Sequence, residues 1–89
     1  MFQYRGRRAD PERADASRRV AAWCRAALAL EDEATVTVSE IACGDPACGG
    51  AETVVLVMRP GRRTAAAKVK MPLSRVTEDV LREALAELA

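Results

Sequence analysis

The sequence contains no histidine and has few aromatic residues. Over 89 residues the aromatic fraction is only 3%, made up by Phe2, Tyr4 and Trp23. The lack of histidine removes Ser-His and Cys-His nucleophile pairs, imidazole metal ligands and the usual general base near neutral pH. We therefore expect no independent enzyme here, with thiol redox chemistry as the most that the chain could catalyse.

Long apolar runs are also lacking. No stretch approaches the length of a membrane span, and the N-terminus lacks the long apolar segment of a signal peptide. The cysteine count of three is odd, which is not typical of a secreted disulfide scaffold. These features predict a cytoplasmic protein with no membrane partner.

Net charge is only +1, which argues against a dedicated nucleic-acid binder. The charge is unevenly spread, because residues 1–30 carry seven arginines against three acidic residues. Binding of RNA or DNA is thus a weaker alternative, and the residues that would carry it are Arg5, Arg7, Arg8, Arg62 and Arg63.

The composition, 49% hydrophobic and 30% charged, predicts one small folded domain over residues 1–89. Residues 1–8 show no period and are interpreted as a flexible basic arm. Asp10-Pro11-Glu12 predicts a helix start, because an aspartate caps orphan N–H groups and proline suits the first helical position. Apolar residues at helical spacing extend this first helix to Leu30, and Cys24 beside that stripe is expected to be buried and inert.

Three strands are predicted next. Residues 35–38 alternate and then lose the alternation at Glu40-Ile41, where a bulge or a strand end is expected. Residues 52–58 are apolar on both faces and suit a central strand, and residues 64–71 form the third strand after an Arg-Pro-Gly-Arg turn of type II sequence.

A second helix follows the strands, with Thr77 as its N-cap. Short links between the strands favour a three-stranded antiparallel meander. We therefore predict an α+β fold of order α-β-β-β-α in two layers, with both helices on one face of the sheet.

Reactive side chains gather in one loop between the first two strands, Cys43-Gly44-Asp45-Pro46-Ala47-Cys48-Gly49-Gly50. Its two thiols can close a disulfide, hold half of a metal site, or only pin a bend. A structural zinc site needs four Cys or His ligands, so one chain does not complete it. Two chains meeting at this loop would supply four thiolates for zinc or an iron-sulfur cluster. Alternatively, Asp45, Glu40 or Glu52 would act as auxiliary ligands.

A redox function needs only Cys43 and Cys48. Six residues bent at Pro46 bring the two α-carbons within disulfide range, roughly 4.4 to 6.8 Å. The glycines leave backbone N–H groups free to stabilise a thiolate, which lowers the thiol pKa and makes it reactive.

The loop and the residues that follow it also resemble a known sequence pattern. Cys43-x-x-Pro46-x-Cys48 is followed by Glu52-Thr53, an apolar strand and Lys68-x-Lys70-x-Pro72 leading to Val76-Thr77-Glu78. This pattern, over roughly residues 34–80, resembles a family of small, largely uncharacterised bacterial proteins that read Cys-x-x-Pro-Gly-Cys-Pro-Pro-x-Glu-Thr in the loop. Here Ala47 replaces the glycine and Gly49-Gly50 the two prolines. The resemblance brings no established activity and implies at most that the loop belongs to a shared site.

Our leading hypothesis is a cytosolic accessory protein that uses Cys43 and Cys48 for metal binding, metal delivery or thiol redox chemistry. The alternative is a non-catalytic interaction module with structural cysteines, docking onto another protein or a second copy of the chain. Its candidate partner-binding residues are Arg18, Arg19, Lys68 and Lys70.

Overall fold

The computed structural model describes residues 11–44 and 49–88. The predicted basic arm at residues 1–8, the Asp10 cap and the loop residues 45–48 lie outside the described residues. None of the described helices is long and apolar enough to cross a membrane.

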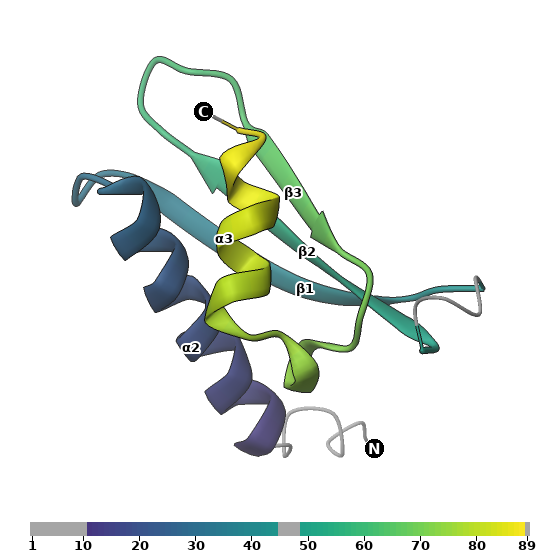
Figure 1. Ribbon diagram of the computed structural model, residues 1–89. Helices are drawn as coiled ribbons and strands as arrows, with labels where there is room; N and C mark the ends of the chain where they lie inside the picture. The colour runs from purple at the N-terminus through teal and green to yellow at the C-terminus, as the bar shows by residue number, and fades with distance from the viewer. Residues whose placement is uncertain (1–10, 45–48, 89) are drawn as a thin grey trace, which may run out of the picture.

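The predicted architecture is confirmed (Figure 1). Helix α2 is followed by three strands in the antiparallel order β1-β2-β3, a short 3-10 helix η2 and helix α3. Both α-helices pack on the same face of the sheet, so the chain forms a two-layer α+β fold. The elements are α2 (Pro11–Leu28), β1 (Thr35–Ala42), β2 (Ala51–Met58), β3 (Ala65–Val69), η2 (Leu73–Arg75) and α3 (Glu78–Ala86).

The core lies between the sheet and the helices. Alternate residues of β2 and β3 face inward, and the helices cover them with small or branched side chains. The fully buried core contains Ala16, Val20, Cys24, Val55, Val57, Ala67, Val69, Leu73, Val76, Leu81 and Leu85. Most of these side chains are alanine, valine or cysteine, so the core between the two layers is thin.

Strand β1 is longer than predicted. It pairs with β2 in unbroken register from Thr35 to Ala42, so the expected bulge or strand end at Glu40-Ile41 is absent. Glu40 points toward the helices opposite the buried Thr53, and its carboxylate accepts a hydrogen bond from Leu73 N–H at 2.8 Å. The inward glutamate is therefore satisfied, and the strand continues through it.

Helix α2 ends at Leu28 rather than at Leu30. Ala29 adopts the left-handed region with φ 50, Leu30 N–H donates to Arg25 O at 3.0 Å, and Ala29 N–H donates to Ala26 O at 3.3 Å. These bonds form a Schellman motif, in which alanine occupies the position that usually holds glycine. The prediction missed this end because alanine gives no stop signal in sequence.

Strand β3 covers Ala65–Val69 and is shorter than the predicted range 64–71. Thr53 Oγ1 donates to Met71 O at 3.0 Å, and Met71 N–H bonds back to Val69 O at 2.8 Å. The chain therefore turns away from the sheet at Met71 and enters η2, an element that the sequence did not predict.

Two predicted local motifs are confirmed. At the β2–β3 link, Gly61 has φ 72 and Arg62 N–H donates to Arg59 O at 3.1 Å, as a type II turn requires. At the start of α3, the Thr77 hydroxyl accepts from Val80 N–H at 3.3 Å. Each motif depends on neighbouring residues only, which is why sequence alone predicts it.

Candidate functional site

The cysteine loop leaves the sheet at the joined ends of β1 and β2. Cys43 N–H donates to Gly50 O at 3.2 Å, which extends the strand pairing by one residue. Gly49 and Gly50 have φ 69 and φ 98, where a residue with a Cβ is strained. The loop therefore starts and ends at the Cys43–Gly50 backbone pair, and its geometry favours glycine at positions 49 and 50.

Cys43 is disulfide-bonded, whereas Cys24 is a free and buried thiol. Cys48 and Asp45, the other loop residues of the predicted site, lie outside the described residues. A cysteine in a disulfide has no thiolate to offer a metal. In the oxidised state described here, Cys43 is thus not available as a zinc or iron-sulfur ligand.

Cys24 occupies the middle of the core on α2, with no exposed surface. Burial raises the pKa of its thiol, an effect that the nearby Arg25 and Arg59 partly oppose. A raised pKa keeps the sulfur as an unreactive thiol. The predicted burial of Cys24 is confirmed.

The auxiliary carboxylates lie on different faces of the sheet. Glu52 is half-buried and pairs across the strands with Ile41 on the face away from the helices, and alternation places Cys43 on that same face. Glu40 lies on the helix-covered face and caps η2, so it is not directed to the loop cysteines. Across residues 11–44 and 49–88, no three acidic or cysteine side chains gather closely enough to hold a metal ion.

The outer face of the sheet carries an apolar stripe along β2. Val54, Leu56 and Met58 are half-buried there, while the neighbouring β1 positions are threonine and serine. Lys68 is exposed opposite Val54, and Ile41 is the large hydrophobic side chain left 45% exposed among the described residues. This face is open in the described part of the chain and is continuous with the cysteine loop.

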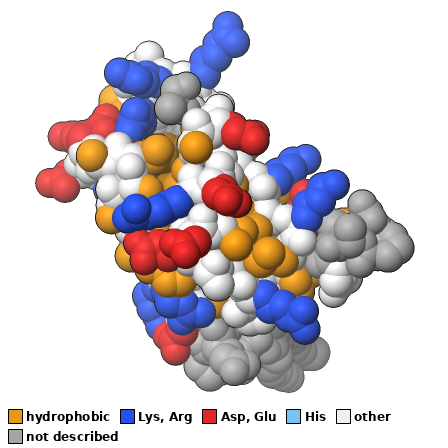
Figure 2. Space-filling view, in the orientation of Figure 1, with side chains coloured by type: hydrophobic (Ala, Val, Ile, Leu, Met, Phe, Trp, Pro, Cys, Tyr) orange, Lys and Arg blue, Asp and Glu red, His pale blue; other side chains and the backbone are white. Residues whose placement is uncertain are grey.

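The predicted partner-binding arginines have intramolecular partners. Arg18 forms an exposed ion pair with Asp15, and the Arg19 guanidinium lies 5.7 Å from the centre of the Trp23 ring. On the helix-bearing side, acidic and basic side chains are interspersed around hydrophobic ones, without a large patch of one sign (Figure 2). Arg18 and Arg19 lie on the helix, whereas Lys68 and Lys70 belong to the β3 side, so the structure does not bring the four together.

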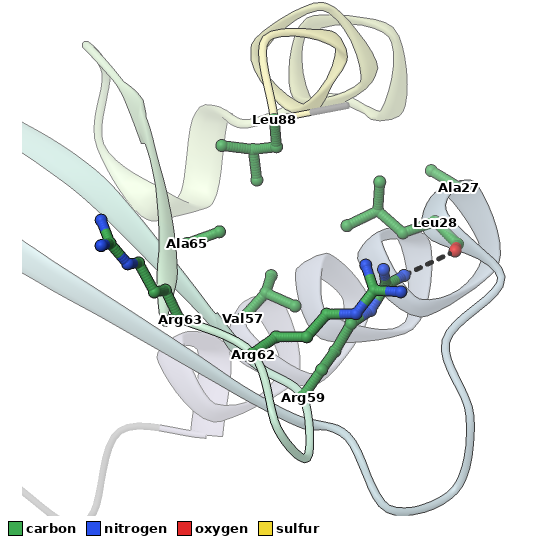
Figure 3. Close-up of a pocket in the computed structure, with 8 residues that line it drawn as sticks. All are labelled: Ala27, Leu28, Val57, Arg59, Arg62, Arg63, Ala65 and Leu88. Atoms are coloured by element: carbon green, nitrogen blue, oxygen red, sulfur yellow. Dashed lines mark hydrogen bonds between the residues drawn. The ribbon is translucent and has the colours of Figure 1, made fainter.

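A cleft between the helix ends and the β2–β3 link was not predicted. It measures about 420 Å³ and combines an apolar lining with three arginines (Figure 3). The lining residues are Ala27, Leu28, Val57, Arg59, Arg62, Arg63, Ala65 and Leu88. In the sequence, this cleft is indicated only by the arginines around Pro60-Gly61. Arg62 and Arg63 were interpreted as candidate nucleic-acid contacts, and no cleft was predicted.

No family model matches this chain, and no curated protein or solved structure matches it. The resemblance of the cysteine loop to a small bacterial family therefore stays a prediction.

Proposed function

We propose that the chain is a small cytosolic accessory protein whose Cys43 and Cys48 alternate between a dithiol and a disulfide. The observation that carries this proposal is the contrast between Cys43, which is disulfide-bonded at the end of the sheet, and Cys24, which is a free thiol in the core. The chain has three cysteines, so Cys48 is the remaining candidate for the partner of Cys43 within one chain.

Redox chemistry is favoured over metal delivery on two grounds. Cys43 is disulfide-bonded, so its sulfur has no thiolate to offer a metal in this state. Cytosolic disulfides are usually transient and catalytic, whereas permanent ones belong to oxidising compartments. The proposed exchange transfers two electrons: the dithiol attacks a disulfide of a partner protein through a mixed disulfide, the partner's two sulfurs take up the two protons and leave as thiols, and the loop ends as the Cys43–Cys48 disulfide.

The open face beside the loop supports partner docking as part of this function. Ile41 is exposed on the face that also carries Glu52 and the apolar stripe of β2. A partner seated there would lie next to Cys43, because that residue follows Ile41 by two positions on the same face.

The test is a redox titration. Purified protein is equilibrated in glutathione buffers of graded potential, free thiols are alkylated after acid quenching, and the modified cysteines are counted by mass spectrometry. We expect a single two-electron transition between about −270 and −180 mV, the range of thiol-disulfide oxidoreductases. Cys24 is an internal control, since its burial protects it from alkylation unless the chain unfolds.

Cys48→Ser provides the mechanistic arm of the experiment. In this variant Cys43 should trap a mixed disulfide with an added disulfide peptide, whereas a Cys43→Ser, Cys48→Ser double variant should trap none. A transition below about −300 mV would indicate a structural bridge. That result would favour the alternative, a non-catalytic interaction module that docks through the open sheet face.

A further inference from the structure

The cleft between α2, α3 and the β2–β3 link has an apolar interior and a cationic rim. Val57 and Ala65 come from the sheet, Leu28 comes from α2, and Leu88 follows α3. Figure 3 shows these aliphatic side chains facing the same space, with arginines of the link beside it. Its volume of about 420 Å³ lies in the range of small-molecule sites, roughly 300 to 1,000 Å³.

The arginines of this cleft differ in their partners. Arg59 donates to Leu28 O at 3.0 Å and lies 3.7 Å from the Glu31 carboxylate, so its charge supports the end of α2. Arg62 extends toward the same end of α2, while Arg63 points away from it (Figure 3). Among the residues that the structure describes, the guanidinium groups of Arg62 and Arg63 make no hydrogen bond or ion pair.

The charges around the cleft select the ligand. Glu31 offsets the charge of Arg59, which leaves the Arg62 guanidinium as the available cation of the rim, and a guanidinium binds a carboxylate through paired N–H donors. Leu28 O at the end of α2 and the Glu31 carboxylate lie beside Arg59, and their negative charge opposes a dianion more strongly than a monoanion. An anion of one charge therefore suits the rim better than a dianion.

We propose that this cleft binds a small monocarboxylate with an aliphatic tail. Its carboxylate lies on Arg62, and its tail lies between Val57 and Leu88. This site is separate from the cysteine loop. The loop joins the end of β1 to the start of β2, whereas the cleft lies at the other end of β2. Binding is thus independent of the redox state of Cys43.

The test is a titration of the full-length, ¹⁵N-labelled chain with octanoate below its micellar range, followed by amide chemical shifts. We expect saturable shifts at Leu28, Val57, Ala65 and Leu88. Acetate lacks the tail and octylammonium has the opposite charge, so neither should produce these shifts. Hexyl phosphate at a pH where it is a dianion should bind more weakly than octanoate.

Two matched pairs of variants test the contacts. Arg62→Gln should weaken octanoate binding by about tenfold, the effect of losing one hydrogen bond to a charged group. Arg75→Gln, at an exposed position of η2 outside the lining, should bind like the original chain. Ala27→Leu should fill the cleft and reduce binding, whereas Ala22→Leu on the exposed part of the same helix should not.

Thermal unfolding of each variant confirms that the fold is retained. Equal shifts with octylammonium, or an unchanged affinity in Arg62→Gln, would overturn the proposal and leave the arginines as supports for the helix ends. Shifts confined to the outer face of the sheet would overturn it as well.

Discussion

Arg59 connects three parts of the chain through one side chain. It begins the β2–β3 link, donates to Leu28 O at the end of α2 and lies 3.7 Å from Glu31 in the loop that follows. The acidic residues at positions 31–33 follow the negative pole of the helix, where negative charge is unfavourable. The Arg59 cation offsets this negative charge. Its Nε is buried without a hydrogen-bond partner in the described residues, so the fit is incomplete.

Ala29 is the residue whose backbone is least suited to its side chain. It ends α2 with φ 50, where a Cβ is unfavourable and glycine is preferred. We predict that Ala29→Gly raises the free energy of unfolding by about 0.5 to 1 kcal/mol, since the relief of strain exceeds the entropy that glycine adds to the unfolded chain. Urea denaturation measures this change.

The matched control for that substitution is Ala26→Gly, in the last turn of the same helix. There the backbone is helical, so glycine should lower stability by about 1 kcal/mol. A loss of stability in both variants would show that Ala29 is not strained.

At the scale of elements, Glu40 and Thr53 hold the segment that connects the sheet to the helices. The two residues face each other across β1 and β2. Thr53 donates to Met71 O, and Glu40 accepts from Leu73 N–H, so both hold the segment that leaves β3 and forms η2. One polar pair beneath the helices thus sets where β3 ends.

Removing the Glu40 carboxylate should therefore destabilise the junction of β3 and η2. Leu73 is only 3% exposed, so Glu40→Ala leaves its N–H buried without this acceptor. We expect a loss of about 1.5 to 3 kcal/mol, the value for a hydrogen bond to a charged group. Glu40→Gln keeps an acceptor and should lose less. Chemical denaturation provides the measurement, and a loss below about 0.5 kcal/mol in Glu40→Ala would contradict this role.

At the scale of the whole molecule, two α-helices cover one face of a three-stranded sheet, and no helix or strand of residues 11–44 and 49–88 covers the other face. The single core is built from small side chains, with Cys24 at its centre. Global stability is therefore sensitive to a charge that appears on this sulfur.

This sensitivity predicts a dependence of stability on pH. Burial raises the pKa of Cys24 in the folded state above its ordinary value of 9.0, so the unfolded chain loses the thiol proton at lower pH. The contribution is fully present below pH 9.0 and is lost as the pH rises through the folded pKa. Denaturation curves between neutral and alkaline pH, recorded without reductant, should show stability falling more steeply than in Cys24→Ala. Parallel pH profiles for the two proteins would refute this coupling.

Part of the candidate site was predictable and part was not. The cysteine loop was found because thiols and turn residues share a short segment, and Cys24 was placed inside because it lies beside an apolar helical stripe. The cleft was missed because its lining comes from the end of α2, the β2–β3 link and Leu88, which are far apart in sequence. The hydrogen bond from Leu73 N–H to Glu40 was not predicted because the two residues lie 33 positions apart.

Local patterning by itself determined the order of the elements, the alternation that selects the inward face of β1, the type II turn at Pro60-Gly61 and the Thr77 cap. Each of these depends on residues within a few positions of one another, so short-range sterics and hydrogen bonding are sufficient. Only the tertiary structure decided where α2 and β3 stop, which carboxylate supports η2 and that arginines border a cleft, because those outcomes depend on groups that folding alone brings together.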